Sequence, residues 1–163
     1  MNMRTLSTGT LLALALLAAS TARAQVPQYG TSVTLDVAHK ALSAAQAEAR
    51  KNGWPMAVAI VDTSGVLVAF ERMDNTQTAS ISVAQDKAVS AAIYRRPTKA
   101  FQDALAGGGA GLRVLSLRGA NAVEGGLPIV VDGKVIGAIG VSGGSAEQDG
   151  QVAKAGLDCL VAK

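Results

Sequence analysis

His39 is the only histidine of this sequence and its best candidate for holding iron. Imidazole is a common axial ligand to haem iron. On a helix with about 100° of rotation per residue, His39 falls beside the apolar stripe, where it could face a pocket or a subunit interface. Ser43, Gln46 and Arg50 continue the same edge of the helix. A solvated flank is therefore the alternative to a ligand site.

A glycine-rich segment offers a second candidate site, for an anion. Ser142, Gly143 and Gly144 join a predicted strand to a predicted helix, and Ser145 and Gln148 have the spacing of a capping box. Exposed amides at such a helix start favour a haem propionate or a small carboxylate. The alternative is a plain turn whose amides are capped by Ser145.

Arg95 and Arg96 form a third candidate site. These adjacent arginines follow a predicted helix that contains Lys87. Two guanidinium groups can hold carboxylates in bidentate geometry. A solvated helix end, favoured by the negative end of the helix dipole, is the alternative.

Several other chemistries find no support in the residue types. A serine triad would need His39 as its base, and no serine has the context of a nucleophile elbow. Cys159 is the single cysteine, which excludes an internal disulfide and a cysteine-rich zinc site. Met73 and Cys159 could ligate iron, but lone residues of these types more often pack in cores. The glycine-rich run 107–111 lacks the Lys-Ser/Thr pair of a phosphate loop. No catalytic residue is identified.

The first 24 residues have the pattern of a signal peptide. Arg4 precedes the apolar run 11–19, and Ala22-Arg23-Ala24 forms an A-x-A cleavage site before Gln25. The run is shorter than the roughly 20 residues that cross a bilayer. We therefore expect a periplasmic or secreted protein with no stable membrane span after cleavage.

Cleavage leaves a chain with almost balanced charge. It removes Arg4 and Arg23 from the 15 basic residues and none of the 12 acidic ones. Nucleic acid is therefore not an expected partner. We expect residues 25–33 to be a short, loosely ordered leader and residues 34–163 to form one domain.

The expected elements alternate hairpins with helices. Thr34 is a good N-cap for a first helix that ends at Asn52-Gly53. Strands 56–61 and 66–70 follow, around the turn 62–65, and then helices 78–94 and 97–106. The segment 112–117 is ambiguous between a strand and a helical turn. A second hairpin, 127–131 and 134–141 around Asp132-Gly133, precedes a last helix at 145–161, and Pro128 favours an edge or the start of its strand. This order predicts an α+β fold, with an antiparallel sheet flanked by helices.

Five motifs along the chain carry a resemblance to a known family. They are Asp62-Thr63-Ser64-Gly65, Arg72-Met73-Asp74, Lys87-Ala88, the run 125–129 and the run 137–144. In this order they resemble GlcG/HbpS-like haem-binding (haem-degrading) proteins over residues 34–161. The resemblance implies a profilin-like sandwich, assembly into a homo-oligomer, and haem as cofactor.

Two functions remain open at this stage, beside the possibility of a structural oligomer that binds no small ligand. The first is an extracytoplasmic haem-binding protein that stores, buffers or presents haem, with His39 as the iron ligand. The second is an enzyme or accessory factor acting on haem or on a small hydroxy-carboxylate such as glycolate. The candidate cofactor contacts are His39, Ser142, Gly143, Gly144, Arg95 and Arg96.

Overall fold

The structure is a computed structural model that describes residues 26–161. The predicted signal peptide, residues 1–24, lies outside the described residues. No helix within residues 26–161 is long and apolar enough to span a membrane.

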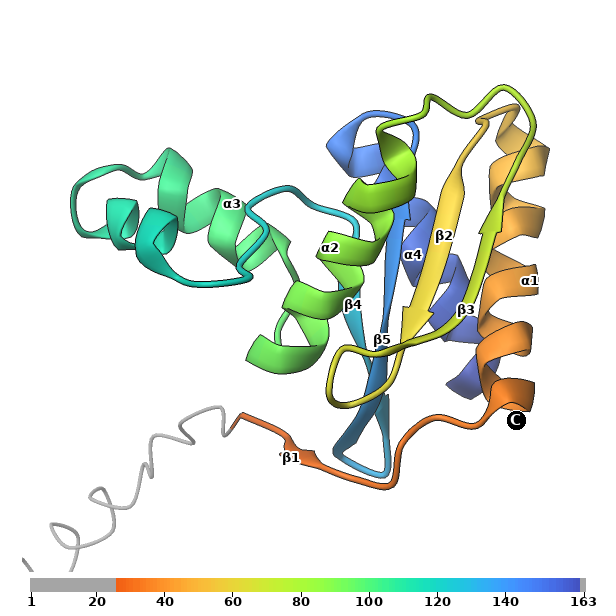
Figure 1. Cartoon of the computed structure of the whole chain (residues 1–163), viewed down its shortest axis with the longest axis horizontal. Helices are drawn as coiled ribbons and strands as arrows, with labels where there is room; N and C mark the ends of the chain where they lie inside the picture. The colour runs from red at the N-terminus through yellow and green to blue at the C-terminus, as the bar shows by residue number, and fades with distance from the viewer. Residues whose placement is uncertain (1–25, 162–163) are drawn as a thin grey trace, which may run out of the picture.

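A five-stranded sheet organises the chain around its longest strand, β5 (Figure 1). The strands are β1 (Gln28–Tyr29), β2 (Ala57–Val61), β3 (Leu67–Arg72), β4 (Gly126–Val131) and β5 (Lys134–Ser142). β5 pairs antiparallel with β4 on one side and with β2 on the other, and β3 extends the sheet beyond β2. Pro128 lies in the edge strand β4, where a residue without an amide hydrogen is tolerated.

Helices cover both faces of the sheet. α1 (Leu35–Asn52) and α4 (Ala146–Val161) pack together on one face, and α2 (Ser80–Tyr94) lies on the other (Figure 1). β2 alternates between the two cores, because Val58 and Ile60 pack towards α1 while Ala57 and Ala59 pack towards α2. The predicted α+β fold, an antiparallel sheet flanked by helices in a single domain, is confirmed.

Close approach between α2 and the sheet depends on glycine. A Cβ on Gly140 of β5 would lie 2.0 Å from the carbonyl oxygen of Ala84, and one on Gly126 of β4 would lie 2.4 Å from that of Lys87. Both distances are far below van der Waals contact. The glycines of the two sequence runs that carry the resemblance therefore let α2 lie directly on the strands.

Two short helices project from the body of the domain as an arm. α3 (Lys99–Ala106) and the 3₁₀ helix η1 (Gly109–Ser116) pack on each other beyond the end of α2 (Figure 1). The predicted helix 97–106 thus begins two residues later than expected. The ambiguous segment 112–117 belongs to a helical turn, and the glycines before it form the tight connection into η1.

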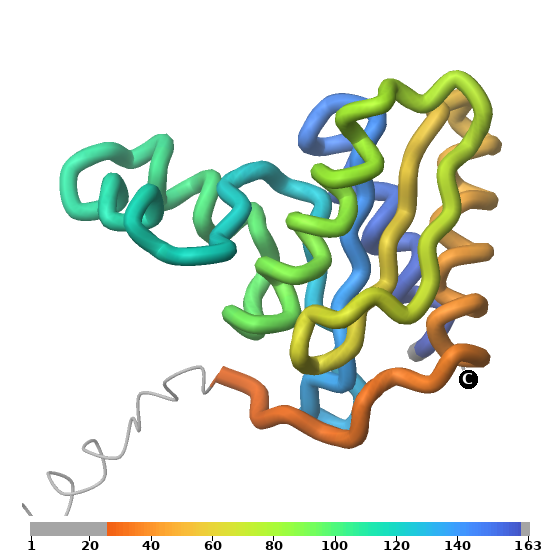
Figure 2. The backbone as a smooth tube through the Cα atoms, in the orientation of Figure 1, coloured from red at the N-terminus to blue at the C-terminus, as the bar shows by residue number. Residues whose placement is uncertain are grey.

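The leader differs from its expected loose order. β1 pairs in parallel with Lys134 and Val135 of β5, and the amides of Gly30 and Val33 donate to carbonyls of β5 at 2.8 and 2.7 Å. Figure 2 shows this segment running along the end of the sheet to the start of α1. Backbone pairing orders a segment that has no helical or strand periodicity of its own.

Local signals correctly located most other boundaries. The side chain of Thr34 accepts a hydrogen bond from the amide of Val37, and Gly53 ends α1 in the left-handed conformation. Asp62 accepts hydrogen bonds from Ser64 and Val66 and so closes the β2–β3 turn. Both predicted hairpins are present.

Candidate functional site

His39 lies on the exposed side of α1, in the second turn of the helix. Leu35, one turn earlier on the same stripe, is 53% exposed. Further along α1, the buried Gln46 and the exposed Arg50 line a polar groove with Met73, which directly follows β3. The imidazole is therefore accessible, and it is not among the residues that line this polar groove.

The glycine-rich turn after β5 is closed by the helix that follows it. The amide of Gly144 donates to Oδ1 of Asp149 at 3.0 Å, and the amide of Ser145 donates to the side chain of Gln148 at 2.9 Å. The hydroxyl of Ser142 is buried against that of Ser80 at 3.1 Å. The amides expected to be open to an anion are thus satisfied by α4 itself, and a carboxylate ligand would have to displace Asp149.

Beneath this turn lies a buried ion pair between α2 and α4. Nζ of Lys87 donates to Oδ2 of Asp149 at 2.7 Å and to the carbonyl oxygen of Val141 at 3.1 Å. The two side chains are 1% and 4% exposed. Gly125 covers the pair so closely that a Cβ there would lie 2.8 Å from the Cβ of Asp149. One lysine thereby ties α2, β5 and α4 together at the end of the sheet that carries the glycine-rich turn.

Burial raises the pKa of the Asp149 carboxyl above its ordinary value. The ion pair with Lys87 and the hydrogen bonds from the amides of Gly143 and Gly144 oppose this shift, because they stabilise the carboxylate. Since the pair is enclosed, it holds the glycine-rich turn and the helices α2 and α4 in position and does not contact a ligand directly.

Arg95 serves the leader. It ends α2 in the left-handed conformation, donates to the carbonyl oxygen of Pro27 at 3.1 Å, and lies over the ring of Tyr29 at 5.0 Å. The hydroxyl of Tyr29 donates in turn to the carbonyl oxygen of Ala92 at 3.0 Å. This guanidinium group is therefore occupied in holding the leader against α2.

Arg96 points instead towards the arm. Its guanidinium group lies 5.6 Å from the ring centre of Phe101, which packs edge-on against Tyr94. Arg96 also lines a groove between α3 and η1. Arg95 and Arg96 are adjacent in sequence, but their guanidinium groups contact different elements, the leader and the arm.

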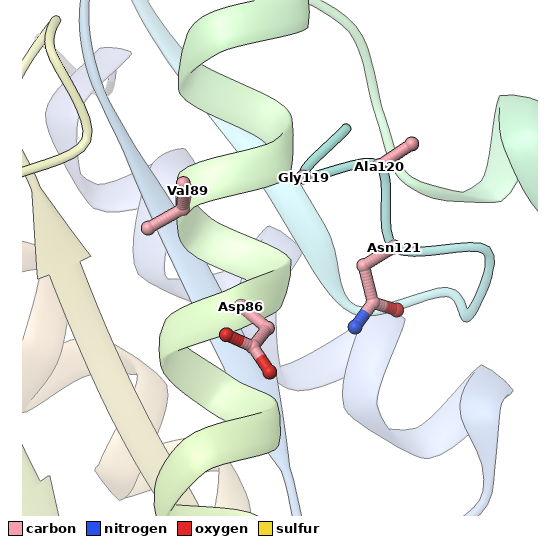
Figure 3. A pocket seen from close by; sticks show the side chains of 5 residues that line it. All are labelled: Asp86, Val89, Gly119, Ala120 and Asn121. Carbon is pink, nitrogen blue, oxygen red and sulfur yellow. The ribbon is translucent and has the colours of Figure 1, made fainter. Parts of the chain in front are cut away.

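A further cavity, of about 290 Å³, opens on the side of α2 (Figure 3). Asp86 and Val89 of α2 line it together with the loop residues Gly119, Ala120 and Asn121. Figure 3 shows the carboxylate of Asp86 and the amide of Asn121 on its two sides. None of the six candidate residues lines it.

The six candidate residues lie in three separate regions. Gly143 packs against Pro55, just beyond the end of α1, whereas His39 lies near the start of that helix. The 14 residues from His39 to Gly53 span about 20 Å at 1.5 Å per residue. Arg95 and Arg96 follow α2, on the opposite face of the sheet from α1 (Figure 1). One ligand cannot contact all three regions of a single chain.

Sequence reasoning missed the pairing of Lys87 with Asp149. The two residues are 62 positions apart, and their spacing along the chain indicates no contact. A charged residue inside the alanine-rich buried stripe of α2 was the available signal, because an unpaired lysine is almost never fully buried. Within residues 26–161, no group of three or more His, Cys, Asp or Glu side chains could hold a metal ion.

Comparison with known proteins identifies close similarities. The family profile for the haem-degrading protein HbpS-like family matches residues 33–158. Protein GlcG of Escherichia coli K12 is 41% identical over 101 residues, which cover 62% of this chain and 74% of GlcG. HbpS of Streptomyces reticuli, as a double mutant, has the same fold with a TM-score of 0.74 at 31% identity, covering 83% of this chain and 91% of that one. The crystal structure of a PduOC:haem complex matches with a TM-score of 0.73 at 28% identity, covering 80% and 96%.

Proposed function

We propose a function from the finding that this chain belongs to the HbpS-like family of haem-degrading proteins. In this proposal, the chain binds haem outside the cytoplasm and stores, buffers or presents it. The observation that carries the proposal is the match to a protein crystallised with haem, which covers 80% of this chain and 96% of that one. Haem is thus the cofactor that the comparisons support best.

His39 is the residue that we assign to the iron. It is the chain's only imidazole, it is exposed, and it follows the exposed Leu35 by one helical turn. A nitrogen ligand beside an apolar side chain fits the chemistry of haem, whose iron takes imidazole and whose ring faces are apolar. Bound haem would supply redox and ligand-binding chemistry, while the residues of α1 hold and orient it.

Contacts from the other candidate residues require a second copy of the chain. Ser142, Gly143 and Gly144 lie about 20 Å from His39 along α1, and Arg95 and Arg96 lie across the sheet. We therefore propose that any of these residues that touch haem held by His39 do so from a neighbouring subunit.

Self-association is part of the same proposal. Leu112 and Leu115 of η1 are 53% and 74% exposed, and residues three apart on a 3₁₀ helix lie in one row. An arm that displays such a row is suited to pack on another copy. Sedimentation velocity of Leu115→Glu, with Ser116→Glu as its exposed control, tests this contact. A lower mass in Leu115→Glu alone supports it, and two unchanged masses contradict it.

The export step rests on the sequence of residues 1–24. The A-x-A pattern at Ala22-Arg23-Ala24 supports cleavage before Gln25. Mass spectrometry of the protein recovered from the periplasm or medium tests it. A chain that begins at Gln25 supports export, and an uncleaved chain retained in the cytoplasm contradicts it.

The alternative function is turnover of haem. Its support is the description of the family as haem-degrading. Incubating the haem-loaded protein with a reductant and oxygen distinguishes turnover of haem from its storage or presentation. Loss of the Soret band with release of iron favours degradation, whereas a stable spectrum favours storage or presentation.

The decisive test of binding is a haem titration of the protein beginning at Gln25, followed by absorbance. We expect saturable binding with a Soret shift that is lost in His39→Ala. Lys40→Ala, the adjacent exposed residue on α1, is the matched control and keeps the shift. An unchanged spectrum in His39→Ala moves the iron to another ligand, and absence of saturable binding refutes the proposal.

A further inference from the structure

The groove between α3 and η1 is a feature that haem binding at His39 does not use. It has a volume of about 360 Å³, which lies within the range of small-molecule sites. Arg96, just after the end of α2, lines it together with residues of α3 and η1. Figure 1 shows the arm on the opposite side of the molecule from α1.

The floor of this groove is apolar. Phe101 of α3 is 3% exposed and Val114 of η1 is 6% exposed, and Leu117 adds a third apolar wall. Val114 is the buried residue of η1, while Leu112 and Leu115, three residues apart, form its exposed outer row. Leu117 follows η1 directly, in an extended conformation. The two helices approach closely at Gly111, where a Cβ would lie 1.8 Å from the carbonyl oxygen of Ala104. The groove is therefore formed by the close packing of the two helices of the arm.

Two cations flank the apolar floor. Arg96 enters from the α2 side and Arg113 from η1, and no acidic side chain is among the lining residues. The one carboxylate of α3, Asp103, is 2.7 Å from Nζ of Lys99. Across the described chain, the ion pairs are made by lysines, and neither Arg96 nor Arg113 takes part in one. Both guanidinium groups therefore retain donors for an added anion.

We infer that this groove binds an amphipathic monocarboxylate. Its apolar tail lies against Phe101, Val114 and Leu117, and its carboxylate accepts hydrogen bonds from Arg96 and Arg113. Charge complementarity selects this ligand class, because an uncharged apolar molecule would leave both cations unpaired and a small polar anion would leave the floor uncovered.

The test is a titration of the purified protein with octanoate below its micellar concentration, followed by amide chemical shifts. We expect saturable shifts in α3 and η1. Arg96→Gln and Arg113→Gln should each raise the dissociation constant roughly fivefold, the size typical of one exposed charge pair. Arg118→Gln removes an exposed arginine just beyond η1 that is not among the lining residues, and it should leave the dissociation constant within twofold. Octanol and acetate should each bind more weakly than octanoate.

Three results overturn the inference. They are the absence of saturable shifts, a dissociation constant that rises as much in Arg118→Gln as in the two groove variants, and octanol binding as tightly as octanoate. Thermal melting of each variant shows that the arm remains folded. Since the titration contains no haem and His39 is not altered, its failure leaves haem binding intact, and failure of the haem titration leaves this groove intact.

Discussion

Replacing Lys87 by methionine isolates the contribution of the buried ion pair. The variant keeps most of the side-chain volume but leaves Asp149, which is 4% exposed at its side chain, without the ammonium group 2.7 Å away. Removing one partner of a buried pair costs about 3–5 kcal/mol, because an uncompensated charge stays in the interior. Small domains have total stabilities of about 5–15 kcal/mol, so we expect a large fall in the free energy of unfolding at pH 7.

The pH dependence of this variant has a definite sign. Burial already raises the pKa of the Asp149 carboxyl above its value in the unfolded chain, and loss of Lys87 should raise that pKa further. A group whose pKa is raised on folding stabilises the folded state below its unfolded pKa and loses that contribution as pH rises through its folded pKa. Lys87→Met should therefore recover part of its lost stability as the pH is lowered from 7 towards 5.

The assay is urea unfolding followed by circular dichroism at several pH values. Lys51→Met is the matched control, because Lys51 is exposed and its pair with Glu48 spans 3.4 Å. We expect this control to unfold like the unaltered protein. Lys87→Met/Asp149→Asn should be more stable at pH 7 than Lys87→Met, since the uncompensated charge is gone. A loss below about 1 kcal/mol in Lys87→Met, or a loss that does not depend on pH, would refute the reasoning.

Two further predictions concern the close packing of α2 and the attachment of the leader. Gly140→Ala places a Cβ 2.0 Å from the carbonyl oxygen of Ala84 and should lower the free energy of unfolding by about 3 kcal/mol. The control Gly107→Ala, whose Cβ would make ordinary contacts at 3.5 Å, should leave this free energy unchanged. Equal stabilities of the two variants would contradict the close packing of α2 on the sheet. Tyr29→Phe removes the hydrogen bond to the carbonyl of Ala92 and should cost about 1 kcal/mol, measured by thermal melting. An unchanged melting temperature would mean that this hydroxyl does not hold the leader.

The elements that sequence reasoning located correctly are those fixed by neighbouring residues. The first helix needs only its cap Thr34 and the terminating Gly53, and the first hairpin needs only the turn around Asp62. These interactions span a few residues, so their patterns are visible along the chain. The α+β order of elements followed from them.

The features that were missed depend on partners distant in sequence. β1 has two residues and no periodicity, and it becomes a strand because β5 begins four residues before its pairing with β2, which leaves Lys134 and Val135 free to pair with it. Asp149 belongs to the first turn of α4, yet its partner is on α2. Sequence reasoning left open whether the amides of the glycine-rich turn bind an anion or are capped, because capping by Asp149 cannot be read from the local Ser145–Gln148 spacing.

Sequence reasoning selected the candidate residues by their types and did not place them relative to one another. The helical wheel placed His39 beside the apolar stripe of the first helix, and the structure shows that this residue is exposed. Separation of the three candidate regions could not be foreseen, because it depends on which end of the sheet and which face each helix occupies. Distances between elements follow from the topology of the fold, and the sequence patterns did not specify that topology.

The central claim is that haem binds at His39 on α1. Paramagnetic broadening of amide signals by ferric haem tests it most directly, since broadening falls steeply with distance from the iron. We predict that added haem broadens the amides of residues 35–43 and that His39→Ala abolishes the effect while Lys40→Ala preserves it. Broadening centred on any other element, or broadening that survives in His39→Ala, would contradict the assignment.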